Sequence, residues 1–78
     1  MIFEQVRKAI AESLGIDPSE ILLGSSFVSL DVDSMDHAQL ILDLEDALKV
    51  EMPDDDAQKF VTVQDVLNYV NDPRSHRN

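Results

Sequence analysis

The sequence contains no cysteine, and it has only six basic residues against sixteen acidic ones. Without cysteine the chain can form neither a disulfide framework nor a cysteine-ligated zinc site. The formal net charge of −10 repels nucleic-acid phosphates and anionic membrane surfaces, because phosphate binding requires clusters of Lys and Arg. We therefore expect no nucleic-acid partner, and protein partners that carry basic patches.

Long apolar runs are missing as well. The first 20 residues alternate apolar and charged positions, and no apolar run approaches the ~20 residues needed to span a bilayer. We therefore expect no membrane insertion, no export and a cytoplasmic location. The length of 78 residues fits one small domain, which we place at residues 1–72 with a flexible tail at 73–78, and we expect a monomer.

The apolar residues that are present recur with helical spacing, which argues against disorder despite the high charge. Residues 2–14 predict a helix, and Gly15 is the residue type that commonly follows a helix end. Its apolar stripe consists of Phe3, Val6, Ile10 and Leu14.

Residues 16–33 predict a long connection. Asp17 to Glu20 has an N-cap Asp, then Pro, then Glu at the third position, which is typical of a capped single turn. Long connections are unusual in small domains and tend to be packed or functional. The apolar residues that predict packing of this loop are Ile21, Leu22, Leu23, Phe27, Val28 and Leu30.

A second main helix is predicted over residues 34–49. Asp33 is a favourable N-cap, and Asp36 three residues later completes an acidic variant of the capping box. When the residues are projected at the helical period, one apolar arc indicates the core face. This arc contains Leu40, Ile41, Leu44, Ala47 and Leu48.

Residues 54–60 predict a short helical segment, and residues 63–71 predict a last helix with Thr62 as its cap. We find no strand signal. The predicted fold is therefore all-α: a small bundle of three main helices plus one short helix, with a long loop between the first and second helices. The apolar stripe of the last helix consists of Val63, Val66, Leu67 and Val70.

The string Asp33-Ser34-Met35-Asp36 places a hydroxyl at the start of a helix, after a long loop. Such a serine is exposed, and the backbone N–H groups at a helix start can meet a phosphate attached to it. Taken alone, the string is most often only a helix cap.

The whole chain, however, resembles the acyl carrier proteins over residues 3–71. That family has Asp-Ser-Leu preceded by Leu-Gly-x; here Asp31 stands in place of the glycine and Met35 in place of the leucine. Asp tolerates the left-handed backbone region better than most residues, and Met for Leu conserves volume. The matching pieces are Leu14-Gly15-Ile16, Ser26-Phe27-Val28, Leu30 to Asp36, Leu44-Glu45, Met52 to Ala57 with Lys59, and Thr62 to Asp65.

The resemblance implies that Ser34 accepts 4′-phosphopantetheine from coenzyme A, through a phosphopantetheinyl transferase. The thiol of this arm would carry acyl groups as thioesters between acyl-transferring, condensing or ligase enzymes of fatty acid, polyketide or related biosynthesis. The chain would then be a carrier and not an enzyme. The alternatives are a carrier for aminoacyl or other specialised thioesters, and an unmodified acidic interaction domain that binds a basic partner.

Two other chemistries are weighed against this interpretation. Ser34 and His37 have the spacing of a nucleophile and a base, but hydrolysis also needs an orienting group and an oxyanion hole. We interpret His37 as a boundary histidine and expect no catalytic residue. The run Asp54-Asp55-Asp56 lacks the alternate ligand spacing and the glycine of calcium loops, so we expect no specific metal site.

The second main helix has more apolar surface than one core contact requires. Met35, Ala38 and Leu42 form an apolar group outside the core arc, beside a polar arc of Asp36, Gln39, Asp43 and Asp46. An apolar patch rimmed by charge is typical of an interface. The residues that we expect to dock partner enzymes are Asp33, Met35, Asp36, Leu42, Asp43, Glu45 and Asp46.

The excess of acidic residues predicts that repulsion among carboxylates lowers the stability of the fold. Added salt or millimolar Mg²⁺ or Ca²⁺ should raise the melting temperature, because both screen the repulsion among sixteen carboxylates. Mild acid should act in the same direction. Thermal unfolding followed by circular dichroism checks this, and a melting temperature that is indifferent to ionic strength would contradict it.

Overall fold

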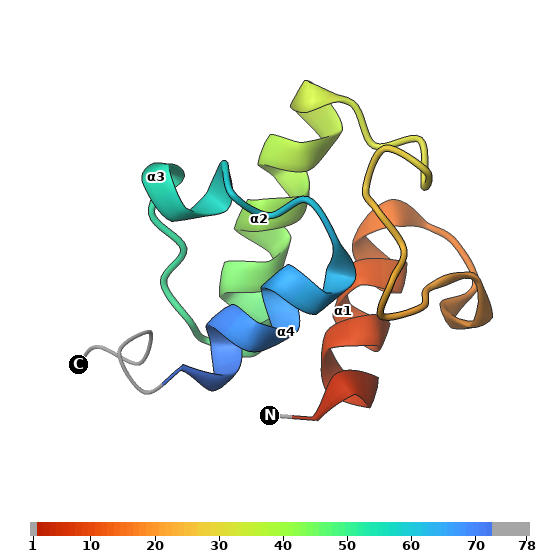
Figure 1. Cartoon of the computed structure of the whole chain (residues 1–78), viewed down its shortest axis with the longest axis horizontal. Helices are drawn as coiled ribbons and strands as arrows, with labels where there is room; N and C mark the ends of the chain where they lie inside the picture. The colour runs from red at the N-terminus through yellow and green to blue at the C-terminus, as the bar shows by residue number, and fades with distance from the viewer. Residues whose placement is uncertain (1, 73–78) are drawn as a thin grey trace.

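The computed structural model describes residues 2–72 and shows four α-helices (Figure 1). They are α1 (Phe3–Leu14), α2 (Ser34–Leu48), α3 (Asp54–Ala57) and α4 (Val63–Asn71), and a 3₁₀ turn, η1 (Pro18–Glu20), follows α1. Three main helices, one short helix and the long connection before α2 are confirmed. The predicted tail at 73–78 lies outside the described residues, and the domain limits stay a prediction.

The helix ends follow the local sequence. Gly15 has φ 70° and donates its N–H to the Ala11 carbonyl at 2.8 Å, as expected for a left-handed C-cap. The α2 helix ends one residue before the predicted limit, because Lys49 is itself left-handed with φ 58°. The predicted helical segment at 54–60 is helical only over α3, and its remaining residues form a turn into α4.

The core lies where α1, α2 and α4 meet, and α1 and α2 run side by side in roughly opposite directions (Figure 1). Ala47 was expected on the core arc but is exposed, because it lies at the edge of that arc and not at its centre. The side chains that are completely buried are Val6, Ile10, Ile21, Leu40, Leu44, Val63, Val66 and Val70.

The loop between η1 and α2 is only partly packed. Ile21 and Phe27 are buried, whereas Leu22, Leu23 and Val28 are exposed, which corrects the expectation that all of them pack. Leu23 and Val28 lie in turns of this loop, and only the single residue Ser26 pairs with Thr62 as an isolated bridge, so the loop turns some of its apolar side chains outward.

Asp31, which replaces the family glycine, has φ 62°. Its N–H donates to the Val28 carbonyl at 3.0 Å, closing the turn that leads into α2. Asp and Asn adopt this region more readily than most other non-glycine residues, so the substitution preserves the turn.

The two apolar faces of α2 predict opposite effects of truncation. Leu44 is 0% exposed, so Leu44→Ala should cost about 2–5 kcal/mol of unfolding free energy. Leu42 is 60% exposed, so Leu42→Ala should leave stability nearly unchanged. Urea unfolding of both variants measures this, and a reversed order would mean that the faces are assigned the wrong way round.

Candidate functional site

Ser34 is the first residue of α2, and its side chain is exposed. Asp33 precedes it as the N-cap: its Oδ1 accepts a hydrogen bond from Asp36 N at 2.8 Å, and Asp36 Oδ2 accepts one from Asp33 N at 3.4 Å. The predicted capping box is therefore confirmed. Within residues 2–72, the N–H groups of Ser34 and Met35 have no acceptor, as expected for the first turn of a helix.

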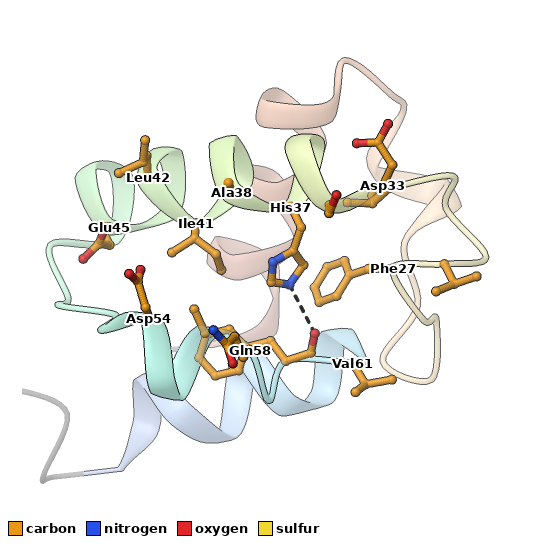
Figure 2. A pocket seen from close by; sticks show the side chains of 15 residues that line it. Phe27, Asp33, His37, Ala38, Ile41, Leu42, Glu45, Asp54, Gln58 and Val61 are labelled. Atoms are coloured by element: carbon orange, nitrogen blue, oxygen red, sulfur yellow. Dashed lines mark hydrogen bonds between the residues drawn. The ribbon is translucent and has the colours of Figure 1, made fainter.

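A cleft of about 640 Å³ opens beside Ser34, between α2, α3, the long loop and the segment before α4 (Figure 2). Most of its lining is apolar, and Phe27, Ile41, Ala57 and Phe60 form the buried part of its wall. Its other lining residues are Val28, Val32, Asp33, Ser34, His37, Ala38, Leu42, Glu45, Asp54, Gln58 and Val61.

His37 is half-buried in the wall of this cleft. Its Nε2 lies 3.3 Å from the Phe60 carbonyl oxygen, and its ring meets the Phe27 ring edge-on at a centroid distance of 5.7 Å. The prediction of a boundary histidine is confirmed. Nε2 is engaged with a backbone carbonyl, and within residues 2–72 no carboxylate hydrogen-bonds to the ring, so the geometry gives no support to a Ser34–His37 catalytic pair.

The acids of α2 are placed differently from one another. Asp43 is half-buried: its carboxylate accepts from Ser13 Oγ of α1 at 2.6 Å and from Gln39 Nε2 at 3.0 Å. The Ser13 hydroxyl, and secondly the Gln39 amide, lower the pKa of Asp43. Glu45 accepts from Met52 N at 2.9 Å. Asp43 thus lies on the predicted polar arc but also joins α1 to α2 through Ser13.

Asp46, by contrast, lies on the open surface, where its carboxylate faces Lys49 Nζ at 3.7 Å. Met35 and Leu42 are also on the surface, with 81% and 60% of their area exposed, and Ala38 beside them is exposed as well. The predicted second apolar group outside the core is confirmed. The residues expected to dock partners therefore form two groups. Met35, Leu42 and Asp46 are exposed, whereas the carboxylates of Asp43 and Glu45 already hold hydrogen bonds within the fold.

Among residues 2–72, no group of three or more His, Cys, Asp or Glu side chains is placed to hold a metal ion. One carboxylate of the aspartate run, that of Asp56, lies 3.0 Å from the Tyr69 hydroxyl of α4. In the same part of the chain, no helix has the length and apolarity that a membrane crossing requires.

Comparison with known proteins agrees with this arrangement. Residues 4–70 match the family model described as a phosphopantetheine attachment site. The acyl carrier protein of Clostridium acetobutylicum is 48% identical over 71 residues, which cover 90% of this chain and 92% of that protein. The acyl carrier protein of Campylobacter concisus is 41% identical, over 88% of this chain and 91% of that protein. The acyl carrier protein of Thermosynechococcus vestitus is 42% identical, over 90% of this chain and 88% of that protein. The chain belongs to the acyl carrier protein family, a family of carriers and not of catalysts.

The residues at the start of α2 fit the phosphopantetheine group that this family carries. An exposed hydroxyl, two backbone N–H groups without an acceptor and an adjoining apolar cleft lie together. Backbone N–H groups at a helix start favour a phosphate, while the Asp33 and Asp36 carboxylates, which would repel it, are turned to the capping hydrogen bonds.

The contact between Ser13 and Asp43 predicts a pH effect. Ser13→Ala should raise the pKa of Asp43, because the main group that stabilises its charged form is lost. A carboxyl with a lowered folded-state pKa stabilises the fold above its unfolded-state pKa, and this contribution disappears as the pH falls through the folded-state value. A carbon-detected NMR titration measures the shift; an unchanged Asp43 pKa would contradict this account. Glu12→Gln, one residue away and outside this contact, is the control.

Proposed function

We propose that Ser34 is the residue to which 4′-phosphopantetheine is attached, and that the chain carries acyl groups between enzymes. When bound, the arm supplies a thiol that holds acyl groups as thioesters. Ser34 offers the hydroxyl, and the first turn of α2 offers N–H groups to the phosphate. The observation that carries the proposal is this exposed serine at a capped helix start beside an apolar cleft.

The other serines near this end of the molecule support the choice of Ser34. Ser25 Oγ accepts from Leu22 N at 3.0 Å, Ser26 Oγ accepts from Ser29 N at 3.0 Å, and Ser29 Oγ donates to the Ser26 carbonyl at 2.7 Å. These hydroxyls hold the loop together. Within the described residues, the Ser34 hydroxyl has no such partner and is free to react.

Two further features suit a carrier. The chain has no cysteine, so the thiol of the arm would meet no competing thiol on the same protein. The cleft between α2 and α3 has a mainly apolar lining that would shelter an acyl chain from water. Fatty acid, polyketide or related biosynthesis is the context that we propose, in the cytoplasm. A dedicated carrier of aminoacyl or other specialised thioesters is the alternative.

We also propose that α2 docks the phosphopantetheinyl transferase and the enzymes that load and unload the arm. Met35 and Leu42 offer exposed apolar contacts, and Asp46 offers an exposed charge to a basic patch. Asp33 and Asp36 add charge beside Ser34. Asp43 and Glu45 remain in the proposed surface, although their carboxylates already hold hydrogen bonds within the fold.

Incubation with coenzyme A and a phosphopantetheinyl transferase should add one arm to the chain. Intact mass should rise by one phosphopantetheine, peptide mapping should place it on Ser34, and Ser34→Ala should remain unmodified. Ser25→Ala is the matched control and should be modified normally. An arm found on a loop serine would overturn the assignment, and no arm at all would favour the unmodified acidic interaction domain.

The docking surface predicts separate effects on association and dissociation. Asp46→Lys should slow association with the transferase and weaken its salt dependence, because long-range charge mainly steers encounter. Leu42→Ala should hasten dissociation by the equivalent of roughly 1–2 kcal/mol, as expected for an apolar anchor. Surface plasmon resonance at several salt concentrations separates the two effects.

Asp36→Lys should also slow association, but it removes half of the capping box and so should cost about 0.5–2 kcal/mol of stability as well. Asp46→Lys is the cleaner variant for that reason. Equal kinetics for wild type, Asp46→Lys and Leu42→Ala would remove α2 from the interface.

A further inference from the structure

The hydrogen bond of His37 determines where the proton of its neutral ring lies. Nε2 is 3.3 Å from the Phe60 carbonyl oxygen, and a carbonyl oxygen can only accept. The neutral ring must therefore carry its proton on Nε2 to make this bond. Nδ1 is then unprotonated and can only accept a hydrogen bond.

This acceptor nitrogen faces the cleft. Figure 2 shows the second ring nitrogen on the side of the imidazole turned away from Phe27, the side on which Ile41 also lines the cleft. Within residues 2–72 nothing hydrogen-bonds to Nδ1. His37 is half-buried, and Nδ1 is not among the completely buried polar atoms without a partner in the described residues.

The other polar groups of the cleft are also mostly acceptors. Glu45 and Asp54 present carboxylates, which accept hydrogen bonds and repel anions, while the Asp33 carboxylate is engaged in the helix cap. Among the lining residues, Gln58 is the only one besides Ser34 and His37 with a side-chain donor. Figure 2 shows Glu45 and Asp54 facing each other across the end of the cleft that is distant from Phe27. A group entering this cleft therefore meets apolar walls and mostly acceptors.

We propose that Nδ1 of His37 is the specificity-determining acceptor of this cleft, and that it favours acyl groups bearing a hydrogen-bond donor, a hydroxyl or an amine, over plain saturated or carboxylated ones. This rests on the proposed attachment at Ser34. Ser34 and His37 line the same cleft and are three residues apart on α2, so they are neighbours on the helix surface.

Hydrogen-bond energetics set the expected size of the preference. A neutral hydrogen bond makes a modest net contribution, so a matched donor should slow release of the acyl group roughly three- to tenfold. A plain acyl chain offers no donor to Nδ1, which then bonds water. A carboxylated chain meets the carboxylates of Glu45 and Asp54, and no lining residue carries a compensating positive charge.

The first test uses the unmodified chain and does not depend on the arm. Long-range ¹H–¹⁵N NMR in mildly alkaline buffer should show the His37 proton on Nε2 and an unprotonated Nδ1. A proton on Nδ1 would overturn the proposal on its own, whatever happens at Ser34.

The second test compares matched four-carbon cargoes. The chain is loaded at Ser34 with butanoyl, 3-hydroxybutanoyl, 3-aminobutanoyl or succinyl arms from the corresponding coenzyme A thioesters, and thioester cleavage by hydroxylamine is timed against the same thioesters of free pantetheine. We expect roughly three- to tenfold extra protection for the hydroxyl and amine cargoes over butanoyl, and less protection for succinyl than for butanoyl. The Nδ1 resonance should also move with the donor-bearing cargoes but not with butanoyl.

Variants separate recognition from packing. His37→Phe keeps a ring of similar shape without acceptors, so the extra protection of 3-hydroxybutanoyl should vanish while butanoyl stays protected. The 3-aminobutanoyl cargo, whose ammonium is also attracted by Glu45 and Asp54, should lose only part of its protection. Ile41→Val, an apolar lining residue, is the control and should change all cargoes alike. His37→Gln, which keeps a donor for the Phe60 carbonyl and an acceptor oxygen, should retain part of the preference if His37→Phe proves unstable.

The outcomes are distinguishable. Failure to load any arm at Ser34 would remove the proposed function, and this proposal with it. Normal loading with the same protection for the hydroxyl and plain cargoes, or a preference for the hydroxyl cargo that survives undiminished in His37→Phe, would overturn the role of His37 alone.

Discussion

The reciprocal hydrogen bonds between Asp33 and Asp36 determine where α2 begins, and the candidate site depends on that position. They place Ser34 in the first turn, where backbone N–H groups lack helical partners. Packing of α2 against α1 then turns His37 and Ile41 to the cleft while Leu44 enters the core. A slip of the whole helix by one residue against α1 would rotate every one of these side chains by about 100°.

The strong acidity has a structural use besides attraction to basic partners. Among the described residues only two ion pairs form, Arg7 with Glu4 and Lys49 with Asp46, and both are local. Several acids instead accept hydrogen bonds from N–H groups. Asp65 accepts from the backbone of Thr62 and Val61, which lowers its pKa and fixes the start of α4. Carboxylates at helix starts also interact favourably with the helix dipole, which offsets part of their mutual repulsion.

Local patterns predicted the helices, and non-local contacts account for what they missed. Periodicity and caps identified α1, α2 and α4, and the Asp-Ser-Met-Asp string identified Ser34 as the candidate residue. Leu22, Leu23 and Val28 are exposed in a loop that is fixed by its pairing with the start of α4, and no local signal predicts that pairing. The contact of Ser13 with Asp43 spans 30 residues, and that of His37 with Phe60 spans 23. Helical projection places Asp43 on the outer arc, but only the packing of α1 against α2 brings a serine to it.

The two rims of the cleft are held by different kinds of bond. On the loop side, Phe27 N donates to the Val61 carbonyl and Val63 N to the Ser25 carbonyl, both at 3.0 Å, so the loop and the start of α4 are joined through their backbones. On the opposite side, α3 is a single turn of four residues. The Tyr69 hydroxyl of α4 donates a hydrogen bond to the Asp56 carboxylate of this turn. Widening the cleft on the loop side breaks backbone pairing, whereas on the α3 side it displaces one short turn. The α3 side is therefore the side on which the cleft can widen without breaking backbone pairing to the loop, and the hydroxyl of Tyr69 and the buried Ala57 are the contacts that would have to shift with it.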